Sequence, residues 1–262
     1  MENTKMRNLL VGVLSLFMLT SFQAGDIQKT LNDINSRYKN VQVSIVNWPD
    51  DLHQKLGKLK KSAFMALPRK ASTGKLPLLI SLHGAGGKTW SIEEQLSRSA
   101  IVKGLSLVEL AGKELILIEP NSFGDWEPKT LNVMLDYLLN KYPQVDPNRI
   151  YVMGHSMGGR GTWDWILNSP ARFAAAAPCG FSTVSDHDEI NGLVNLPIWG
   201  MVGASDHKNV ESIKKMVELL RATGNANVRY TAFSEANHSK GNAAVFSAVE
   251  WIDWMMTFSL ED

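Results

Sequence analysis

Cysteine is almost absent from this chain. Of 262 residues only Cys179 carries a thiol, so no disulfide can form within the chain and no cysteine-rich metal site is possible. The residue lies in the small-residue run "AAAAPCGF", where no neighbouring base would activate a thiolate. We therefore expect Cys179 to be a buried packing residue.

An excess of either charge is also lacking. The chain has 27 Lys and Arg against 26 Asp and Glu, which gives a formal net charge of +1. No basic stripe interleaved with aromatic residues is present, so a nucleic-acid partner is not expected. The hydrophobic content of 44% is ample for the core of one α/β domain of this length.

Long apolar runs are absent after the first residues. The run from Leu9 to Leu19 is too short to span a membrane comfortably. It follows Lys5 and Arg7 and precedes small and polar residues, which is the layout of a secretory signal. We predict a signal peptide over residues 1–24.

The cleavage site of this signal is less well defined. Ala24 suits the last residue before cleavage, but Phe22 at the −3 position is bulkier than usual. Cleavage would leave residues 25–262 as a single catalytic domain, exported to a periplasm or out of the cell without stable membrane insertion. An uncleaved amphipathic anchor is the alternative.

Short apolar runs alternate with helical patterns along the rest of the chain, which favours a mostly parallel sheet with helices on both faces. We see one irregular stretch, residues 182–195, and it is short, so any cap over the sheet should be small or absent. The expected strands lie within 41–48, 59–68, 75–84, 114–120, 149–156, 173–180, 196–206 and 227–238, and the expected helices cover 125–142, 157–168, 212–222 and 243–258.

The segment "YVMGHSMGGRGTWDW" contains a G-x-S-x-G motif between an expected strand and an expected helix. Glycines at positions 154 and 158 allow a turn too sharp for larger neighbours, and this turn would hold Ser156 in a strained conformation with its hydroxyl projecting from the sheet. The serine would also stand at a helix N-terminus, where the amide of Met157 faces the position of a developing oxyanion. Ser156 is therefore the candidate nucleophile.

A serine hydroxyl needs a base to accept its proton. His238 follows the last expected strand, so it should lie at the same carboxyl edge of the sheet as Ser156. We expect the other histidines to do other work: His207 to face solvent, His155 to point away from the nucleophile, His53 to sit in an early turn and His187 to lie in the irregular stretch.

The base in turn needs a carboxylate to hold its tautomer. Asp206 ends an expected strand and stands between Ser156 and His238 in the chain, in the order Ser, Asp, His. Asp186 and Asp188 are its rivals. The competing interpretation of Asp206 is a helix N-cap.

The loop "HGAGG", residues 83–87, follows an earlier strand and has small residues whose amides can approach a substrate carbonyl. We expect Ala85 to be the second oxyanion donor, with Gly86 possible, and His83 to brace the loop. A phosphate-binding loop is excluded because "GAGGKT" is too short for G-x-x-x-x-G-K-[ST].

Two tryptophans near these loops are candidate substrate contacts. Trp90 lies just beyond the glycine-rich loop and Trp126 follows an expected strand, so either could stack on a sugar or phenolic ring. Packing in the core or at its rim is the competing interpretation for both.

With these residues together the chain resembles the α/β-hydrolase superfamily over nearly everything after residue 40. The stretches "LPLLISLHGAGG", "VDPNRIYVMGHSMGGRGTWDW" and "RFAAAAPCGF" resemble its secreted esterase branch, which includes feruloyl and acetylxylan esterases, polyhydroxybutyrate depolymerase-like proteins and predicted peptidases related to prolyl oligopeptidase. The resemblance implies hydrolysis of small or polymer-linked carboxylic esters through an acyl-enzyme, with no metal or organic cofactor. A serine peptidase and a non-catalytic binding protein on the same scaffold stay open.

Overall fold

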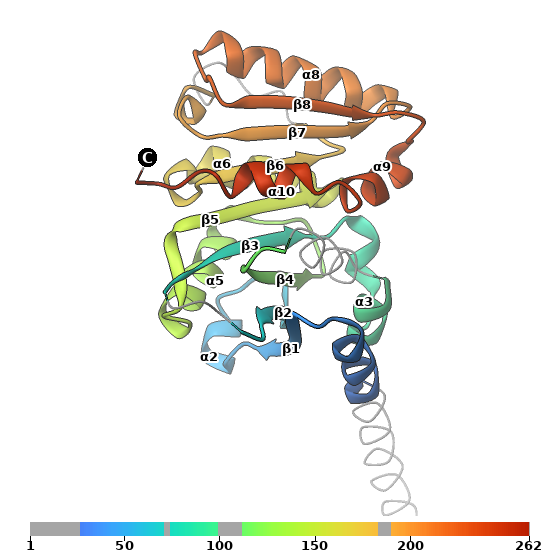
Figure 1. Ribbon diagram of the computed structural model, residues 1–262, viewed down its shortest axis with the longest axis vertical. Helices are drawn as coiled ribbons and strands as arrows, with labels where there is room; N and C mark the ends of the chain where they lie inside the picture. Colours follow the sequence, from blue (N-terminus) through green and yellow to red (C-terminus); the bar gives the residue numbers. More distant parts are fainter. Residues whose placement is uncertain (1–26, 71–73, 99–111, 183–189, 262) are drawn as a thin grey trace, which may run out of the picture.

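The computed structural model describes residues 27–70, 74–98, 112–182 and 190–261. Their centre is one eight-stranded sheet with the strand order β1-β2-β4-β3-β5-β6-β7-β8, in which the strands lie one above another in Figure 1. β1 and β2 are antiparallel to each other, β2 is antiparallel to β4, and every later pairing is parallel. The α/β-hydrolase fold predicted from the sequence is thereby confirmed.

The strands are β1 (Val41–Asn47), β2 (Leu59–Pro68), β3 (Leu76–Leu82), β4 (Ile116–Ser122), β5 (Val145–His155), β6 (Ala175–Cys179), β7 (Ile198–Gly203) and β8 (Val228–Phe233). The helices are a segment over residues 27–37, α2 (Asp50–His53), α3 (Ile92–Arg98), α5 (Pro128–Lys141), α6 (Met157–Asn168), α8 (His207–Ala222), α9 (His238–Val245) and α10 (Glu250–Met255), with short 3₁₀ turns η1 (Ala85–Thr89), η2 (Pro170–Arg172) and η3 (Asn191–Leu193).

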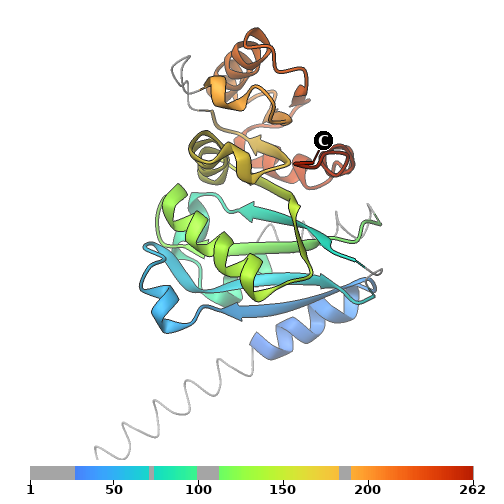
Figure 2. The same cartoon turned by 90° about the vertical axis from the view of Figure 1, so that its left-hand side faces the viewer.

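The central strands are covered on both faces. Every residue of β3, β4 and β6 is buried, including the polar residues Glu119, Asn121 and Ser122 of β4. Exposed residues interrupt the buried ones in the edge strands β1 and β8. Helices α5, α6 and α8 pack on one face through a core that includes Leu135, Trp165 and Met216. The other face is covered by residues 27–37, α3, α9 and α10 (Figure 2).

The helix expected over residues 243–258 is wrong. The structure has two shorter helices instead, α9 beginning at His238 and α10 beginning at Glu250. Asn237 caps the first of them, because its side chain accepts a hydrogen bond from the Lys240 amide. At the break the indole of Trp251 donates to the carbonyl of Val245, 2.8 Å away and six residues earlier, so a side-chain hydrogen bond stabilises the interruption.

The helix α8 begins five residues before its expected start. The helical segments at residues 27–37, α2 and α3 were not predicted. α2 and α3 are short, whereas the first has apolar residues at helical spacing, Ile27, Leu31 and Ile34, a signal that the sequence analysis did not use. Residues 1–24, the predicted signal peptide, lie outside the described residues, as does half of the irregular stretch on which the prediction of a small cap depends. None of the helices in the described part of the chain is long and apolar enough to cross a membrane.

Candidate active site

Ser156 stands between β5 and α6 in a conformation that side chains rarely adopt. Its φ is 59° and its ψ is −116°, and its amide donates to the carbonyl of Cys179 at 2.9 Å. A non-glycine residue at positive φ is strained, so the surrounding turn must hold it there. Because Met157 is the first residue of α6, its amide has no acceptor within the helix.

The glycines around the serine are required by close backbone approaches. A Cβ at Gly154 would lie 2.4 Å from the Gly158 carbonyl oxygen, and a Cβ at Gly158 would lie 1.9 Å from the Leu82 carbonyl oxygen. A Cβ at Gly159 would lie 2.2 Å from the carbonyl oxygen of Cys179. The start of α6 is thus pressed against the ends of β3 and β6, which fixes the serine at the carboxyl edge of the sheet.

Three side chains from distant parts of the sequence form one hydrogen-bonded chain at this edge. The Nε2 of His238 lies 2.8 Å from the Oγ of Ser156, and its Nδ1 lies 2.6 Å from the Oδ2 of Asp206. The side chain of Asp206 is 11% exposed and that of His238 is 43% exposed. The carboxylate is shielded from solvent, whereas the imidazole can reach a bound substrate.

Asp206 does occupy the N-cap position of α8, but it does not act as a side-chain cap. Its main-chain carbonyl accepts from the amides of Asn209 and Val210, both at 2.9 Å, and no side-chain capping hydrogen bond forms. The carboxylate faces His238 instead. Asp186, Asp188 and His187 lie outside the described residues.

The loop after β3 is braced by His83. Its Nδ1–H donates to the Gly84 carbonyl at 2.8 Å, and its Nε2 accepts from the Ser122 amide at 3.0 Å, with the Asn121 Oδ1 3.1 Å away. Burial lowers the pKa of His83 to about 4. The ring therefore stays neutral near pH 7 and ties the loop to the end of β4.

The same loop contacts the nucleophile directly. A Cβ at Gly84 would lie 3.3 Å from the His155 carbonyl oxygen and 3.6 Å from the Ser156 Cβ. Ala85 and Gly86 then begin η1, where the first amides have no acceptor within the turn. The two expected sources of oxyanion donors, residue 157 and residue 85, thus flank the serine.

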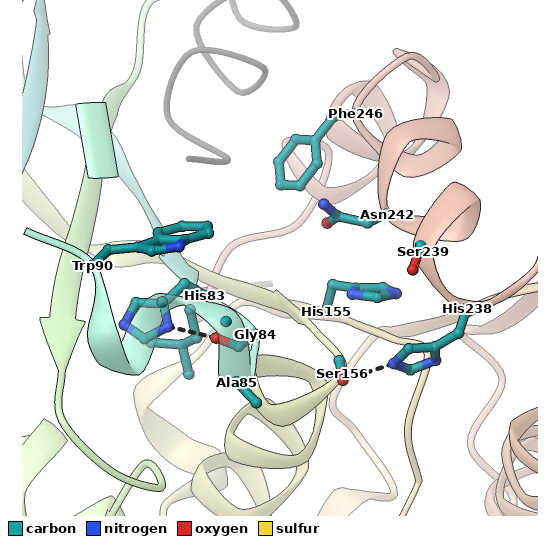
Figure 3. A pocket seen from close by; sticks show the side chains of 13 residues that line it. His83, Gly84, Ala85, Trp90, His155, Ser156, His238, Ser239, Asn242 and Phe246 are labelled. Atoms are coloured by element: carbon teal, nitrogen blue, oxygen red, sulfur yellow. Dashed lines mark hydrogen bonds between the residues drawn. The ribbon is translucent and has the colours of Figure 1, made fainter. Parts of the chain in front are cut away.

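A pocket of about 360 Å³ opens beside the serine (Figure 3). In Figure 3 the indole of Trp90 lies on one side of the pocket, and Phe246, Asn242, Ser239 and the imidazoles of His155 and His238 lie on the other. Its lining consists of Leu82, His83, Gly84, Ala85, Gly86, Gly87, Trp90, His155, Ser156, His238, Ser239, Asn242 and Phe246. Within the described ranges no group of three or more His, Cys, Asp or Glu side chains is arranged to hold a metal.

Comparison with known proteins agrees with this architecture. Residues 129–245 match the sequence model of the dienelactone hydrolase family, and this segment contains the nucleophile turn, the strand before Asp206 and all of α9. The chain belongs to the α/β-hydrolase superfamily.

Relatives of this α/β hydrolase are also hydrolases. A Salmonella typhimurium LT2 protein named provisionally as a carboxymethylenebutenolidase is 29% identical over a 205-residue alignment, which covers 68% of this chain and 72% of the relative. A crystal structure of a thermostable esterase superposes with a TM-score of 0.64 at 25% identity, covering 84% of this chain and 63% of the esterase, so the chain spans less than two thirds of that protein. These matches make the chain an enzyme of the hydrolase class.

A ferulic acid esterase structure shares the fold at lower identity. It superposes with a TM-score of 0.64 at 15% identity, covering 83% of this chain and all of the esterase. At this identity the likeness concerns the arrangement of the sheet and helices.

Of the two tryptophans predicted as substrate contacts, one lines the pocket and the other is buried outside it. Trp90 lines the pocket of the hydrolase, and its carbonyl accepts from the Lys60 ammonium at 2.7 Å. Trp126 is 3% exposed, outside the pocket, and its indole donates to the His83 carbonyl at 3.1 Å. The prediction for Trp126 is therefore wrong, because the residue packs beneath the glycine-rich loop and cannot contact a substrate.

His155 also differs from its expected position. Its ring lies against that of His238, with 4.8 Å between centroids and 44° between planes, and it lines the pocket of the hydrolase. The prediction that it points away from the nucleophile is wrong. His207 is exposed and Cys179 is fully buried, both as expected, and burial raises the pKa of that thiol.

Ser239, Asn242 and Phe246 were missed by the sequence analysis. They follow His238 at one, four and eight residues, so they extend along the helix that begins at the base. Their spacing from His238 was the available signal, but it became useful only once a helix was known to begin at that residue.

Proposed function

We propose that the protein is a serine hydrolase of carboxylic esters that works through an acyl-enzyme on Ser156. The supporting observation is the continuous chain from the Ser156 hydroxyl through His238 to Asp206, with separations of 2.8 and 2.6 Å beside a pocket. This arrangement pairs a nucleophile with a base and the base with an orienting acid.

In the first step Ser156 attacks the carbonyl carbon of the ester while His238 accepts its proton. Asp206 stabilises the imidazolium that forms and holds its tautomer. The amides of Met157 and Ala85 donate to the oxygen of the tetrahedral intermediate, where preorganised donors contribute most to the rate.

In the second step the intermediate collapses and the alcohol leaves. The imidazolium of His238 gives its proton to the leaving oxygen, and the acyl group stays on Ser156. A water molecule then attacks the acyl-enzyme with His238 as its base, which releases the acid and restores the serine.

The pocket favours an ester with an aromatic or apolar group. Trp90 and Phe246 provide flat apolar walls, and Asn242 provides a polar group next to Phe246. Feruloyl and acetyl esters of plant polymers fit this class. The carboxymethylenebutenolidase name of the relative points to a lactone, which is a cyclic ester and would use the same chemistry.

The direct test is labelling with a fluorophosphonate probe followed by peptide mapping. We expect the label on Ser156, and we expect Ser156→Ala to remain folded and to lose turnover of p-nitrophenyl acetate by several powers of ten. Turnover near the wild-type rate in that variant would disprove the proposal.

The substrate class is tested by a panel of methyl ferulate, aryl acetates, a simple lactone and an aminoacyl-proline amide. We expect hydrolysis of esters. Cleavage of the amide alone would favour the serine peptidase, and no turnover of any compound together with no labelling would favour a binding protein.

Export is part of the same proposal, supported by the charged start and the apolar run of residues 1–24. It is tested by fractionating cells that express the full chain and sequencing the mature N-terminus. We expect a start at Gly25 in the periplasmic or extracellular fraction. Retention of the intact N-terminus in the membrane fraction would indicate an anchor.

A further inference from the structure

Asn209 lies in the first turn of α8, three residues after Asp206. Its Nδ2 donates to both carboxylate oxygens of Asp206, at 3.0 Å to Oδ1 and 2.9 Å to Oδ2. We propose that Asn209 is a positioning residue that holds the carboxylate of Asp206 in the orientation that His238 requires. This inference rests on the proposed function, because it assigns a role within that triad.

The chemistry of the three groups determines the direction of each contact. An ionised carboxylate only accepts hydrogen bonds, so the NH₂ group of Asn209 must face it. The Nδ1–H of His238 donates to the Oδ2 of Asp206 at 2.6 Å. The 3.4 Å approach of the Asn209 Nδ2 to the His238 Nδ1 therefore joins two donors and is not a hydrogen bond. Asn209 acts on the imidazole only through the carboxylate.

Asp206 needs such a restraint because of its place in the fold. An aspartate at the N-cap ordinarily turns its side chain to the amides of the second and third helical residues. In α8 these are the amides of Lys208 and Asn209, and the carboxylate does not bond to them. Rotation toward those amides would carry the carboxylate away from His238. The side chain of Asn209 opposes this rotation by donating to both carboxylate oxygens, one of which also accepts from His238.

The proposal predicts that activity and stability respond differently to removal of the amide. In Asn209→Ala the carboxylate is free to cap α8, so the melting temperature should stay the same or rise. The same change should lower kcat for an aryl acetate by about 10- to 100-fold, since small displacements of a catalytic group have effects of this size. KM should change little. A parallel fall of kcat and melting temperature, or an unchanged kcat, would overturn the proposal.

A second variant reports on the charge at this position. Asn209→Asp places a second carboxylate against that of Asp206, where it cannot donate a hydrogen bond unless protonated. The added negative charge favours the protonated imidazole of His238. We expect the acid limb of the kcat/KM profile to move to higher pH in this variant. In Asn209→Ala it should move to lower pH, because the carboxylate of Asp206 can turn away from the imidazole. An unmoved limb in Asn209→Asp would contradict the assigned contact.

A double-mutant cycle separates action through Asp206 from independent effects. If Asn209 acts only through the carboxylate, Asn209→Ala should cost little further activity in an Asp206→Asn background. If the fold-losses of activity in Asn209→Ala and Asp206→Asn multiply in the double variant, the two residues act independently and the proposal is overturned. Lys208→Ala, an exposed change in the same helical turn, is the matched control and should keep wild-type kcat.

Ser156→Ala keeps the two proposals apart. If Ser156→Ala is inactive and Asn209→Ala retains wild-type kcat and pH profile, only the positioning role is wrong. If Ser156→Ala retains activity, the proposed function itself is wrong, and the positioning role falls with it.

Discussion

Two histidines at the same edge of the sheet have opposite environments. His83 follows β3, is 4% exposed, and has both ring nitrogens occupied by neighbouring groups of the loop and of β4. His238 follows β8, has a side chain that is 43% exposed, and turns one nitrogen to a hydroxyl in the pocket. Burial keeps the first imidazole neutral and structural, whereas the second is partly exposed at the pocket.

The largest expected effect is a loss of activity when the imidazole of His238, but not that of His83, is the catalytic base. His238→Ala should lower kcat/KM for p-nitrophenyl acetate by about 10³-fold or more, because Ser156 loses its base. The unfolding free energy should change by less than about 1 kcal/mol, because the ring is partly exposed. Steady-state kinetics and urea unfolding on the same preparation check both. If His238→Ala unfolds the protein but the folded fraction keeps its activity, His238 is a structural residue and not the base.

The second expected effect is a pH dependence of the unfolding free energy that comes from His83. Burial lowers the folded-state pKa of His83 to about 4, against about 6.5 for an unfolded histidine. The unfolded chain therefore binds a proton that the folded chain does not, and stability present above pH 6.5 is lost as the pH falls toward 4. At about 1.4 kcal/mol per pH unit the loss is about 3 kcal/mol.

This loss is checked by urea unfolding between pH 4 and 7 in the wild type and in His83→Asn. The variant should be less stable at pH 7 but should lack the share of the pH slope that His83 contributes. An identical slope in both proteins would show that His83 does not carry it.

A smaller expected effect tests how closely the protein packs around the imidazole of His83. A Cβ at Gly87 would lie 2.4 Å from the Nδ1 of His83, so Gly87→Ala should destabilise the protein by about 1–3 kcal/mol through overpacking. Gly86→Ala is the matched control, because its Cβ would lie 3.7 Å from the Trp90 ring, an ordinary contact. Thermal unfolding of the pair should show a lower midpoint for the first variant only, and equal midpoints would contradict the close packing.

The smallest expected effect concerns two tryptophans, Trp90 in the pocket and Trp126 beneath the glycine-rich loop. Trp90→Ala should raise KM for methyl ferulate about three- to tenfold and leave that for a small acetate nearly unchanged, because a flat wall of the pocket is removed. Trp126→Phe should leave both KM values unchanged and lower stability by about 1 kcal/mol through the lost indole hydrogen bond. An altered KM in the second variant would return Trp126 to the substrate site.

Much of the fold was predictable because its signals are local. The apolar runs in β3 and at the start of β4, residues 76–82 and 116–118, are buried, and such runs predict central strands. The turn around Ser156 was equally plain, since strand, glycines and helix are contiguous. Where local signals were weak, as in the short polar helix α2, or where a contact such as Trp251 to Val245 divides a helical pattern, prediction failed.

The sequence by itself determined the class of fold, the strained serine and the order in which a hydroxyl, a carboxylate and an imidazole follow strands, because each depends on neighbouring residues and on the rule that parallel strands share a carboxyl edge. Only the tertiary structure decided which side chains point toward the pocket and which point into the core. Trp126 turns into the core, His155 turns onto His238, and Asn209 reaches the acid, because these directions depend on how helices and loops distant in sequence pack around the edge of the sheet.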